Sequence, residues 1–372
     1  MTPPHYNFIR STFSLHRTIP PVCRVPQQSW LICRHSSTNL QRRKLADVQR
    51  FQNPTQAYND RVNPPASTRP SPLDIAKRSP DQGWASYAWK SGKSYLGFYR
   101  AGIKNIWGNY KAARELRTRL KLVARRQTSE KPSGSVLRVS ITPTVSVPIG
   151  SLTRAEFQLL KRNSFDTRRI PIFGLLFLIF GEWLPVVVIF FTRLVPYTCR
   201  IPKQIEQSRR KAEERRQISF RGILKGAEAP APRHVAVTAP SIVEEIKGLK
   251  RSELLHISRS LGLHGRFWDR LSPSGETLGL RLPPTAVLMY KVKKHLHYLE
   301  QDDHLMKRDG KASDLVDEEV RIACEERGVD VLQQKTSGLR EVLQSWQNGG
   351  QKNSTLNMLL SRPSVWAKLF RT

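Results

Sequence analysis

Apolar side chains recur at every third or fourth position in several stretches of this 372-residue chain, which is the spacing of one face of an α-helix. In the C-terminal third, this spacing predicts helices over residues 241–247, 251–261, 285–300, 314–327 and 337–347. The pattern Ser241-Ile-Val-Glu244 is a capping box that would begin the first of them. No alternation of apolar and polar residues competes with the helical spacing, so we predict an all-α domain over residues 241–347.

A second helical pattern lies within residues 84–169 and is strongly basic. Apolar residues from Ile103 to Val123 keep the spacing of three to four, while six lysines and arginines lie elsewhere around the same helix. Such a basic amphipathic helix can lie on an anionic membrane leaflet, bind RNA, pack against the membrane helix of a neighbour, or pack on its own protein. The pattern alone does not distinguish these alternatives.

One stretch is apolar enough to cross a membrane. From Ile170 to Phe191 it carries a single ionisable residue, Glu182, and a helix of this length covers about 33 Å. We predict a transmembrane helix over residues 170–195, kinked about one turn before Pro185. Basic residues flank it almost equally on both sides, so the sequence gives no orientation.

Glu182 is the candidate functional residue of this span, together with Pro185. A carboxylate at mid-membrane depth costs on the order of 3 kcal/mol, so it requires a partner or a function. Two interpretations stay open: a proton or cation site, or a protonated carboxyl that bonds a backbone carbonyl freed by Pro185. The first requires an oligomer, because one helix cannot enclose an aqueous path.

The N-terminal segment has the composition of a targeting signal. Residues 1–46 hold seven lysines and arginines and no acidic residue, and the first carboxylate is Asp47. We predict a mitochondrial presequence, which the inner-membrane potential draws inward. The alternative is a basic arm that binds nucleic acid.

Charge is distributed unevenly along the rest of the chain, whose formal net charge is +32. Residues 241–346 are balanced, with 17 basic and 17 acidic residues, so the excess lies elsewhere. A basic run follows the apolar stretch and suits anionic lipids or ribosomal RNA. The contact candidates are Arg209, Arg210, Lys211, Arg215 and Arg216 in this run, and Lys291, Lys293 and Lys294 in the C-terminal domain.

The sequence contains no recognisable catalytic or metal-binding motif. Gly92-Lys93-Ser94 resembles the end of a P-loop, but Tyr87 stands where the earlier glycine is required. Asp302 and Asp303 are adjacent, so their side chains should diverge on a helix. The four cysteines form no C-x-x-C pair. We therefore expect no enzyme, no cofactor, no bound metal and no specific DNA partner.

Several motifs together resemble the Letm family of mitochondrial inner-membrane proteins, over roughly residues 84–347. The similar segments are Tyr95–Ala113, Leu152–Glu156, the apolar stretch with Glu182 and Pro185, Leu299–Leu305, Asp317–Val329 and Leu339–Trp346. The residues that carry the C-terminal motif are Asp302, Asp303, Gly310, Ala323, Cys324, Arg327, Gly328 and Trp346.

The resemblance implies a single-pass inner-membrane protein whose C-terminal domain is a helical, 14-3-3-like domain facing the matrix. It implies binding of mitochondrial ribosomes and support for membrane insertion or assembly of their products. The alternative that it implies is a component of a K⁺ or Ca²⁺/proton exchange system that controls ion and volume homeostasis. The partners expected are the mitochondrial ribosome, the inner membrane with its anionic lipids, and a second copy of the chain.

This protein is expected to be a short form of the family, without the EF-hand and long coiled coil of the larger members. The sequence-based division is a presequence (1–46), a disordered linker (47–83), a basic amphipathic region with a linker (84–169), a transmembrane helix (170–195), a basic juxtamembrane helix and linker (196–240), the Letm-type domain (241–347) and a tail (348–372).

Overall fold

The computed structural model describes residues 59–75, 80, 83–129, 138–142, 145–180, 194–225, 246–271, 283–352, 355–364 and 366. The chain divides into two compact units, Met1–Pro54 and Thr55–Thr372, and every described residue belongs to the second. The predicted presequence, the membrane candidates Glu182 and Pro185, and the predicted capping box at Ser241 lie outside the described residues.

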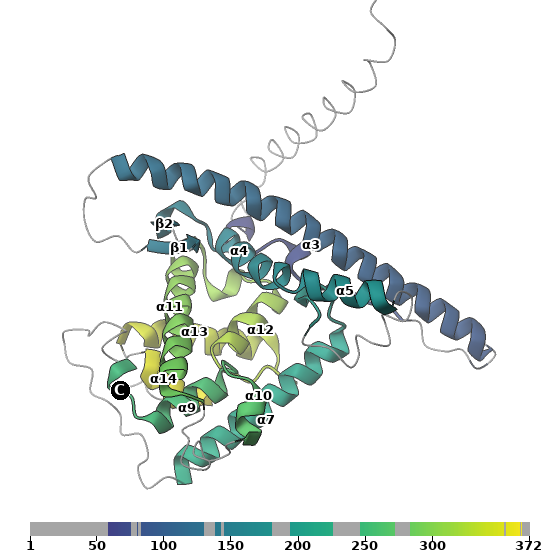
Figure 1. Cartoon of the computed structure of the whole chain (residues 1–372). Coiled ribbons are helices and arrows are strands. Elements are labelled where there is room, and N and C mark those ends of the chain that lie inside the picture. Colours follow the sequence, from purple (N-terminus) through teal and green to yellow (C-terminus); the bar gives the residue numbers. More distant parts are fainter. Residues whose placement is uncertain are drawn as a thin grey trace, which may run out of the picture. The chain divides into compact units, whose positions relative to one another are not determined.

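The second unit is mostly helical, which confirms the all-α prediction in its main feature (Figure 1). The elements of its first half are η1 (Ala66–Thr68), α3 (Trp84–Ser129), β1 (Arg138–Thr142), β2 (Val145–Pro148), η2 (Ile149–Ser151), α4 (Arg154–Thr167), α5 (Ile170–Phe180), η4 (Tyr197–Cys199) and α7 (Pro202–Lys225). Those of its second half are α9 (Arg251–Ser260), α10 (Arg266–Leu271), α11 (Thr285–Asp309), η5 (Ala312–Asp314), α12 (Asp317–Glu326), α13 (Thr336–Lys352) and α14 (Thr355–Leu360).

One short hairpin departs from the all-α prediction. β1 and β2 pair antiparallel, with Val139 opposite Val147, inside a stretch that the sequence suggested as a linker. Both valines are buried, in the same hydrophobic cluster as Leu116 and Leu120 of α3. The Pro, Ser and Thr content indicated a linker, but the valines alternate with polar residues and so give this hairpin one apolar face that α3 covers.

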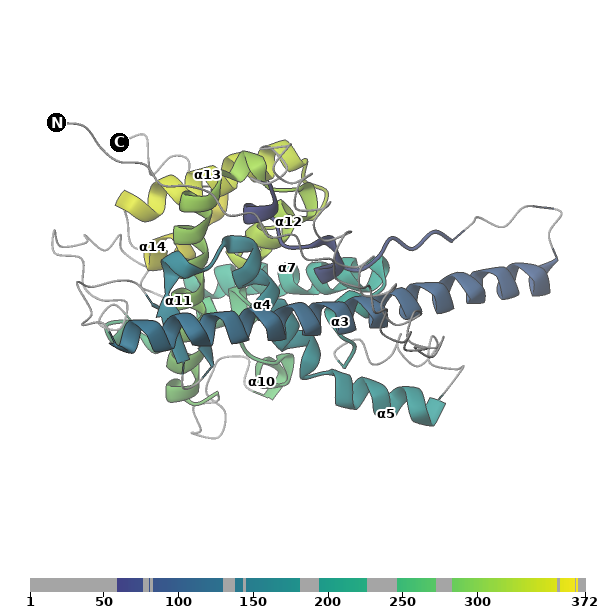
Figure 2. The ribbon, with the colours of Figure 1, turned by 90° about the horizontal axis from the view of Figure 1, so that it is seen from above.

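The long basic helix α3 packs on its own protein, which is one of the alternatives that the sequence left open. It lies beside α4, η1, η4 and β2, and Figure 2 shows α4 running along its middle. Ile106, Ala113, Leu116 and Leu120 are buried on one face at helical spacing. The opposite side of α3 remains exposed, and its lysines and arginines lie there.

The predicted membrane segment is described only in its first half. There the structure has α5, Ile170–Phe180, an eleven-residue helix whose residues Leu175, Leu178 and Ile179 are exposed. Among the residues that the structure describes, no helix combines the length and the apolar character needed to cross a membrane. Residues 181–193 make up most of the rest of the predicted span and lie outside the described residues.

Part of the predicted N-terminal linker is packed against the C-terminal domain. Val62 is fully buried in the C-terminal hydrophobic core. Asn63 accepts a hydrogen bond from the backbone N–H of Val316 and donates one to the carbonyl of Asp314, each at 2.9 Å. Prolines and polar residues in this segment indicated disorder, but contacts with residues about 250 positions away hold it in place.

The C-terminal domain extends beyond its predicted end at residue 347. Leu356, Met358, Leu359 and Trp366 are buried in the same core as Trp346, so this part of the predicted tail belongs to the domain. The helix predicted over residues 285–300 is α11, which continues to Asp309 because the sequence offers no helix breaker before Gly310. Such boundaries depend on capping and on tertiary contacts, which periodicity does not reveal.

Candidate functional site

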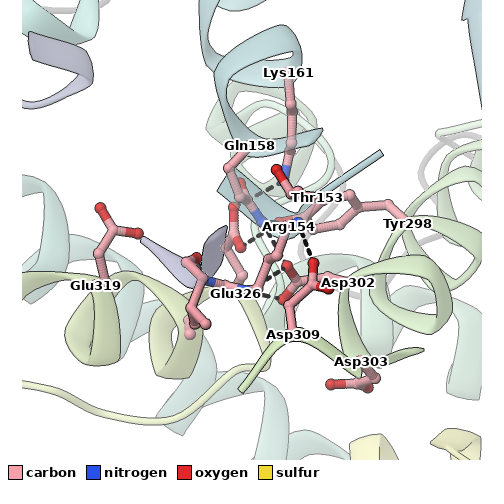
Figure 3. A network of polar contacts seen from close by, with 12 residues as sticks. Thr153, Arg154, Gln158, Lys161, Tyr298, Asp302, Asp303, Asp309, Glu319 and Glu326 are labelled. Carbon is pink, nitrogen blue, oxygen red and sulfur yellow. Dashed lines mark hydrogen bonds and ion pairs between the residues drawn. The ribbon is translucent and has the colours of Figure 1, made fainter. Parts of the chain in front are cut away.

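A network of buried ion pairs forms where α4, α11 and α12 meet (Figure 3). Its centre is Asp302 of α11, which is fully buried. Arg154 Nε donates to Asp302 Oδ1 at 2.9 Å, and Arg327 Nη2 donates to Asp302 Oδ2 at 2.8 Å. The two arginine side chains are 1 % and 0 % exposed, so one carboxylate holds two guanidinium groups away from water.

The start of α4 places Arg154 in this network. Thr153 is the N-cap and forms a capping box with Glu156, which fixes Arg154 as the first helical residue. The backbone N–H of Arg154 has no partner within the helix and donates instead to Asp309 Oδ2 at 2.7 Å. Its Nη1 donates to the carbonyl of Val62 at 3.0 Å, so α4 is joined to both α11 and the N-terminal segment.

Arg327 connects the adjacent Asp302 and Asp303, whose side chains were expected to diverge on a helix. Its Nη2 reaches Asp302 at 2.8 Å and Asp303 at 2.5 Å, because one guanidinium can lie between side chains that point to neighbouring sides of a helix. Asp303 Oδ2 also accepts from the indole of Trp346 at 2.8 Å. The next residue, Gly328, has φ of +80°, a backbone conformation that favours glycine and ends α12.

A second branch of the network runs through Gln158. Its side-chain amide donates to Asp302 Oδ1 at 2.7 Å and to the Tyr298 hydroxyl at 2.8 Å. Tyr298 in turn donates to Glu326 at 2.6 Å, and Lys161 of α4 donates to the other oxygen of the same carboxylate at 2.7 Å. This branch forms a second connection between α4 and α12.

An outer branch adds a bidentate pair between α4 and α12. Arg162 donates to both oxygens of Glu319, at 2.8 and 2.7 Å, and to the Thr68 hydroxyl at 3.1 Å. Arg69 lies 3.7 Å from the same carboxylate. The paired oxygens of Glu319 are buried, so the N-terminal segment, α4 and α12 share one charge cluster.

Opposite charges determine the ionisation of the network. Burial raises the pKa of Asp302, but Arg154 and Arg327 outweigh that effect and hold the pKa well below its usual range. Burial likewise raises the pKa of Glu326, and Lys161 lowers it below its usual range. Burial and the neighbouring Glu326 and Asp302 carboxylates raise the pKa of Tyr298, which therefore stays a neutral donor. The network is thus a set of matched charges.

This arrangement can join parts of the protein but offers little for chemistry. Its carboxylates and guanidinium groups already bond one another, and its central members have almost no contact with water. Throughout the described part of the chain, no group of three or more His, Cys, Asp or Glu side chains could hold a metal ion. The sequence signal for the network was the Letm-like motif, but its geometry depends on contacts between distant segments.

The other motif residues belong to the same domain core. Ala323 and Cys324 are buried on the inner face of α12, and Gly310 ends α11. Burial raises the thiol pKa of Cys324 to about 11, so this thiol remains protonated and unreactive at neutral pH. The motif residues therefore build and close the domain core.

Most of the predicted basic contact run faces its own protein. Arg209 pairs with Glu318 at 2.8 Å and with Glu325 at 3.1 Å, and Arg215 pairs with Asp269 at 2.6 Å. Arg216 is buried and bonds Glu213 and the carbonyl of Ser260. These arginines dock α7 against the C-terminal domain. Of the run, Arg210 is the most exposed, at 62 %, and it pairs with Glu206.

The predicted lysines of α11 present a more open surface. Lys293 and Lys294 are exposed, whereas Lys291 is half-buried. Tyr290 beside them is 65 % exposed, and Lys294 Nζ lies 6.0 Å from the centre of its ring. An exposed aromatic ring among lysines suits contact with a nucleic acid.

One arrangement that no sequence motif indicated resembles a catalytic relay. Ser258 Oγ lies 2.6 Å from His264 Nδ1, and His264 Nε2 lies 2.8 Å from Asp269 Oδ1. However, Ser258 is fully buried, and Arg215 and Arg259 both pair with Asp269. No substrate can reach the hydroxyl, so the three residues fix the turn after α9 and carry no nucleophilic chemistry.

Two family models match this chain. Residues 84–229 match the PNT1 model, described as the pentamidine resistance factor domain, and residues 277–365 match the model described as LETM1-like, RBD. No curated protein and no solved structure gives a match. The ion network lies between these two matched regions, since Arg154, Gln158 and Lys161 belong to the first and Asp302 and Arg327 to the second. Residues 277–365 are therefore a LETM1-like domain, and the two matches together support the resemblance of this chain to the Letm family.

Proposed function

We propose that this protein is anchored in the mitochondrial inner membrane and that its C-terminal domain, in the matrix, binds the mitochondrial ribosome. Bound there, it supports membrane insertion or assembly of ribosomal products. The observation that carries this proposal is the match of residues 277–365 to the LETM1-like RBD model. The acid-free residues 1–46 and the apolar residues 170–191 support import and anchoring. A 14-3-3-like arrangement of the domain remains part of the proposal.

The ribosome contact that we favour is the outer face of α11 with Tyr290, Lys293 and Lys294. Lysine side chains neutralise phosphates, and an exposed tyrosine ring can stack on an unpaired base. These side chains project into solvent, whereas Arg209, Arg215 and Arg216 bond groups of their own chain. The two kinds of basic residue should therefore respond differently to mutation.

Cosedimentation of the full chain with mitochondrial ribosomes tests this contact. Lys293→Glu with Lys294→Glu should weaken binding and make it less sensitive to salt, because two phosphate contacts are lost. The matched control reverses two exposed lysines farther along, Lys307→Glu with Lys311→Glu, and should bind as the unchanged protein does. Equal binding by all three proteins would exclude this face, and no binding by any of them would exclude the function.

Protease protection tests the membrane topology. A C-terminal tag should resist protease in mitoplasts with the outer membrane opened and become sensitive after detergent lysis. Cleavage of the tag in mitoplasts would place the domain in the intermembrane space and exclude ribosome binding in the matrix.

A second candidate is a component of a mitochondrial K⁺ or Ca²⁺/proton exchange system. It is favoured by Glu182, the single ionisable residue of an apolar stretch, and it requires an oligomer that encloses a path. Glu182→Gln should abolish cation-dependent proton flux in proteoliposomes, with Glu206→Gln in the exposed part of α7 as the control. Normal flux through the Glu182→Gln protein would exclude this site.

A further inference from the structure

The helix α3 has two apolar faces, and the described part of the chain covers one of them. The covered face holds Phe98, Ile106, Ala113, Leu116 and Leu120. The second face consists of large side chains in contact with water, with exposed fractions of 81 % for Trp89, 64 % for Leu96, 45 % for Ile103 and 60 % for Trp107.

These four exposed residues form one continuous stripe. At about 100° per residue, their positions fall within about 40° of one another around the helix axis, roughly 120° from the covered face. The stripe follows the helix for about 27 Å, at 1.5 Å per residue. Four large apolar side chains in line are more than the isolated exposed residue found on most protein surfaces.

Basic residues line one edge of the stripe. Four basic residues there are all exposed: Lys93, Arg100, Lys104 and Lys111. Measured around the helix axis from the centre of the covered face, they lie at roughly 160° to 200°, beside the stripe at roughly 120°. Lys111 Nζ lies 5.3 Å from the centre of the Trp107 ring. The sole acidic residue of α3 is Glu115, so this edge is positive along its whole length.

The neighbouring helix α5 is also apolar and exposed. It is joined to α3 through a small core that includes Phe98, Tyr99 and Phe173. Its own residues Leu175 and Leu178 are 57 % and 82 % exposed. Two adjoining helices thus both leave apolar side chains in contact with water, and α5 is the first part of the predicted membrane segment.

We infer that α3 lies on the surface of an anionic lipid bilayer, with Trp89, Leu96, Ile103 and Trp107 at the boundary of the acyl chains and Lys93, Arg100, Lys104 and Lys111 on the head groups. Tryptophan side by side with aliphatic residues and a flanking row of lysines is the composition of an in-plane amphipathic helix. RNA fits less well, because Leu96 and Ile103 offer no stacking surface or hydrogen bond to a base. This inference deepens the proposed membrane attachment and rests on it.

Spin labels on the full chain, reconstituted in nanodiscs, test the position of α3. One label is placed by Ile103→Cys in the stripe and another by Ala112→Cys, which lies exposed on the opposite side of the helix. Cys23 and Cys33 are replaced by Ser in both proteins so that the label does not react there, whereas Cys199 and Cys324 are buried and are kept. In discs of phosphatidylcholine with cardiolipin, the label at position 103 should be severalfold more accessible to oxygen than to a water-soluble nickel complex, relative to the label at position 112.

Charge reversal provides the second arm of the test. Lys93→Glu, Lys104→Glu and Lys111→Glu together should return the label at position 103 to water, because like charge repels the anionic head groups. Equal exposure of both labels to the nickel complex in every disc would overturn the inference. So would immobilisation of the label at position 103 by added RNA but not by lipid, which would favour a nucleic-acid surface.

Failure of this inference can be told apart from failure of the proposed anchoring. A protein that resists alkaline extraction from the discs while the label at position 103 stays in water is anchored without α3. A protein that alkali removes, but whose label at position 103 is shielded by cardiolipin vesicles, binds through α3 without the span.

Discussion

At the scale of single residues, the ion pairs of Asp302 affect the stability of the fold strongly because they are buried. The carboxylate balances two guanidinium groups, and removal of one member leaves charge in a medium of low dielectric constant. Removal of one partner from a more exposed pair, such as Arg340 with Asp317, leaves no buried unpaired charge, because water solvates the partner that remains.

Asp302→Asn should therefore lower the free energy of unfolding by about 3 to 5 kcal/mol. The control Asp317→Asn removes a carboxylate that is 68 % exposed and should change it by less than about 1 kcal/mol. Urea denaturation of the purified proteins measures both values. Similar small changes in the two variants would mean that the network contributes little to stability.

His256 should make stability depend on pH. Burial lowers the pKa of this histidine to about 4 from 6.5, so between these values the unfolded chain binds a proton that the folded chain does not. The contribution of neutral His256 to the free energy of unfolding is complete above pH 6.5 and is lost as the pH falls through 4. The loss over this range totals about 3 kcal/mol.

The measurement is the free energy of unfolding at several pH values between 4 and 7, for the unchanged protein and for His256→Gln. The glutamine variant should show a shallower slope, because it cannot titrate while its amide can still bond Ser219. An identical slope in both proteins would assign the pH dependence to other groups.

At the scale of elements, a close contact determines where α3 crosses η4. Gly102 lies against this turn, and a Cβ atom there would be 2.7 Å from Cys199 Sγ and 3.1 Å from the Thr198 carbonyl oxygen. Glycine weakens a helix interior, so its presence here reflects the approach of the backbone of η4.

Gly102→Ala should lower the melting temperature, because the clash with Cys199 and Thr198 outweighs the gain in helix propensity. Gly108→Ala in the same helix meets nothing within 4 Å and should stabilise the protein by about 0.5 to 1 kcal/mol. Thermal unfolding followed by circular dichroism compares the two. An increase in melting temperature for both variants would show that η4 moves aside at little cost.

At the scale of the whole molecule, the region that matches PNT1 and the LETM1-like domain are interlocked. Arg154, Lys161 and Arg162 of α4 all bond carboxylates of the C-terminal domain, and Arg209 of α7 bonds two more. Residue Val62 completes the C-terminal core. The two matched regions therefore behave as parts of one folding unit.

A fragment of residues 246–372 alone should be more sensitive to limited proteolysis than the same residues in the full chain, because Asp302, Glu319 and Glu326 lose their partners from α4. Co-expression with residues 55–225 should restore protection and allow the two fragments to be purified together. Equal resistance of the isolated fragment would show that the domain folds independently.

The sequence predicted α9, α11, α12 and α13 of the C-terminal domain, since their apolar faces repeat with the period of a helix, but it did not predict α10 or α14. It failed at β1 and β2, at residues 59–75 and beyond residue 347, where polar or proline-rich segments become ordered through contacts with distant parts of the chain. It also assigned Arg209, Arg215 and Arg216 to a binding surface, because composition shows the charge of a side chain but not its partner.

The sequence by itself determined the helical character, the net positive charge of the first half and the motifs that resemble the Letm family, because each depends on residues close together in the chain. Only the tertiary structure decided that Arg154, Asp302 and Arg327 meet, and which basic residues remain exposed. The physical reason is that a buried charge requires a partner at hydrogen-bond distance, and folding brings that partner from a segment whose sequence gives no sign of it.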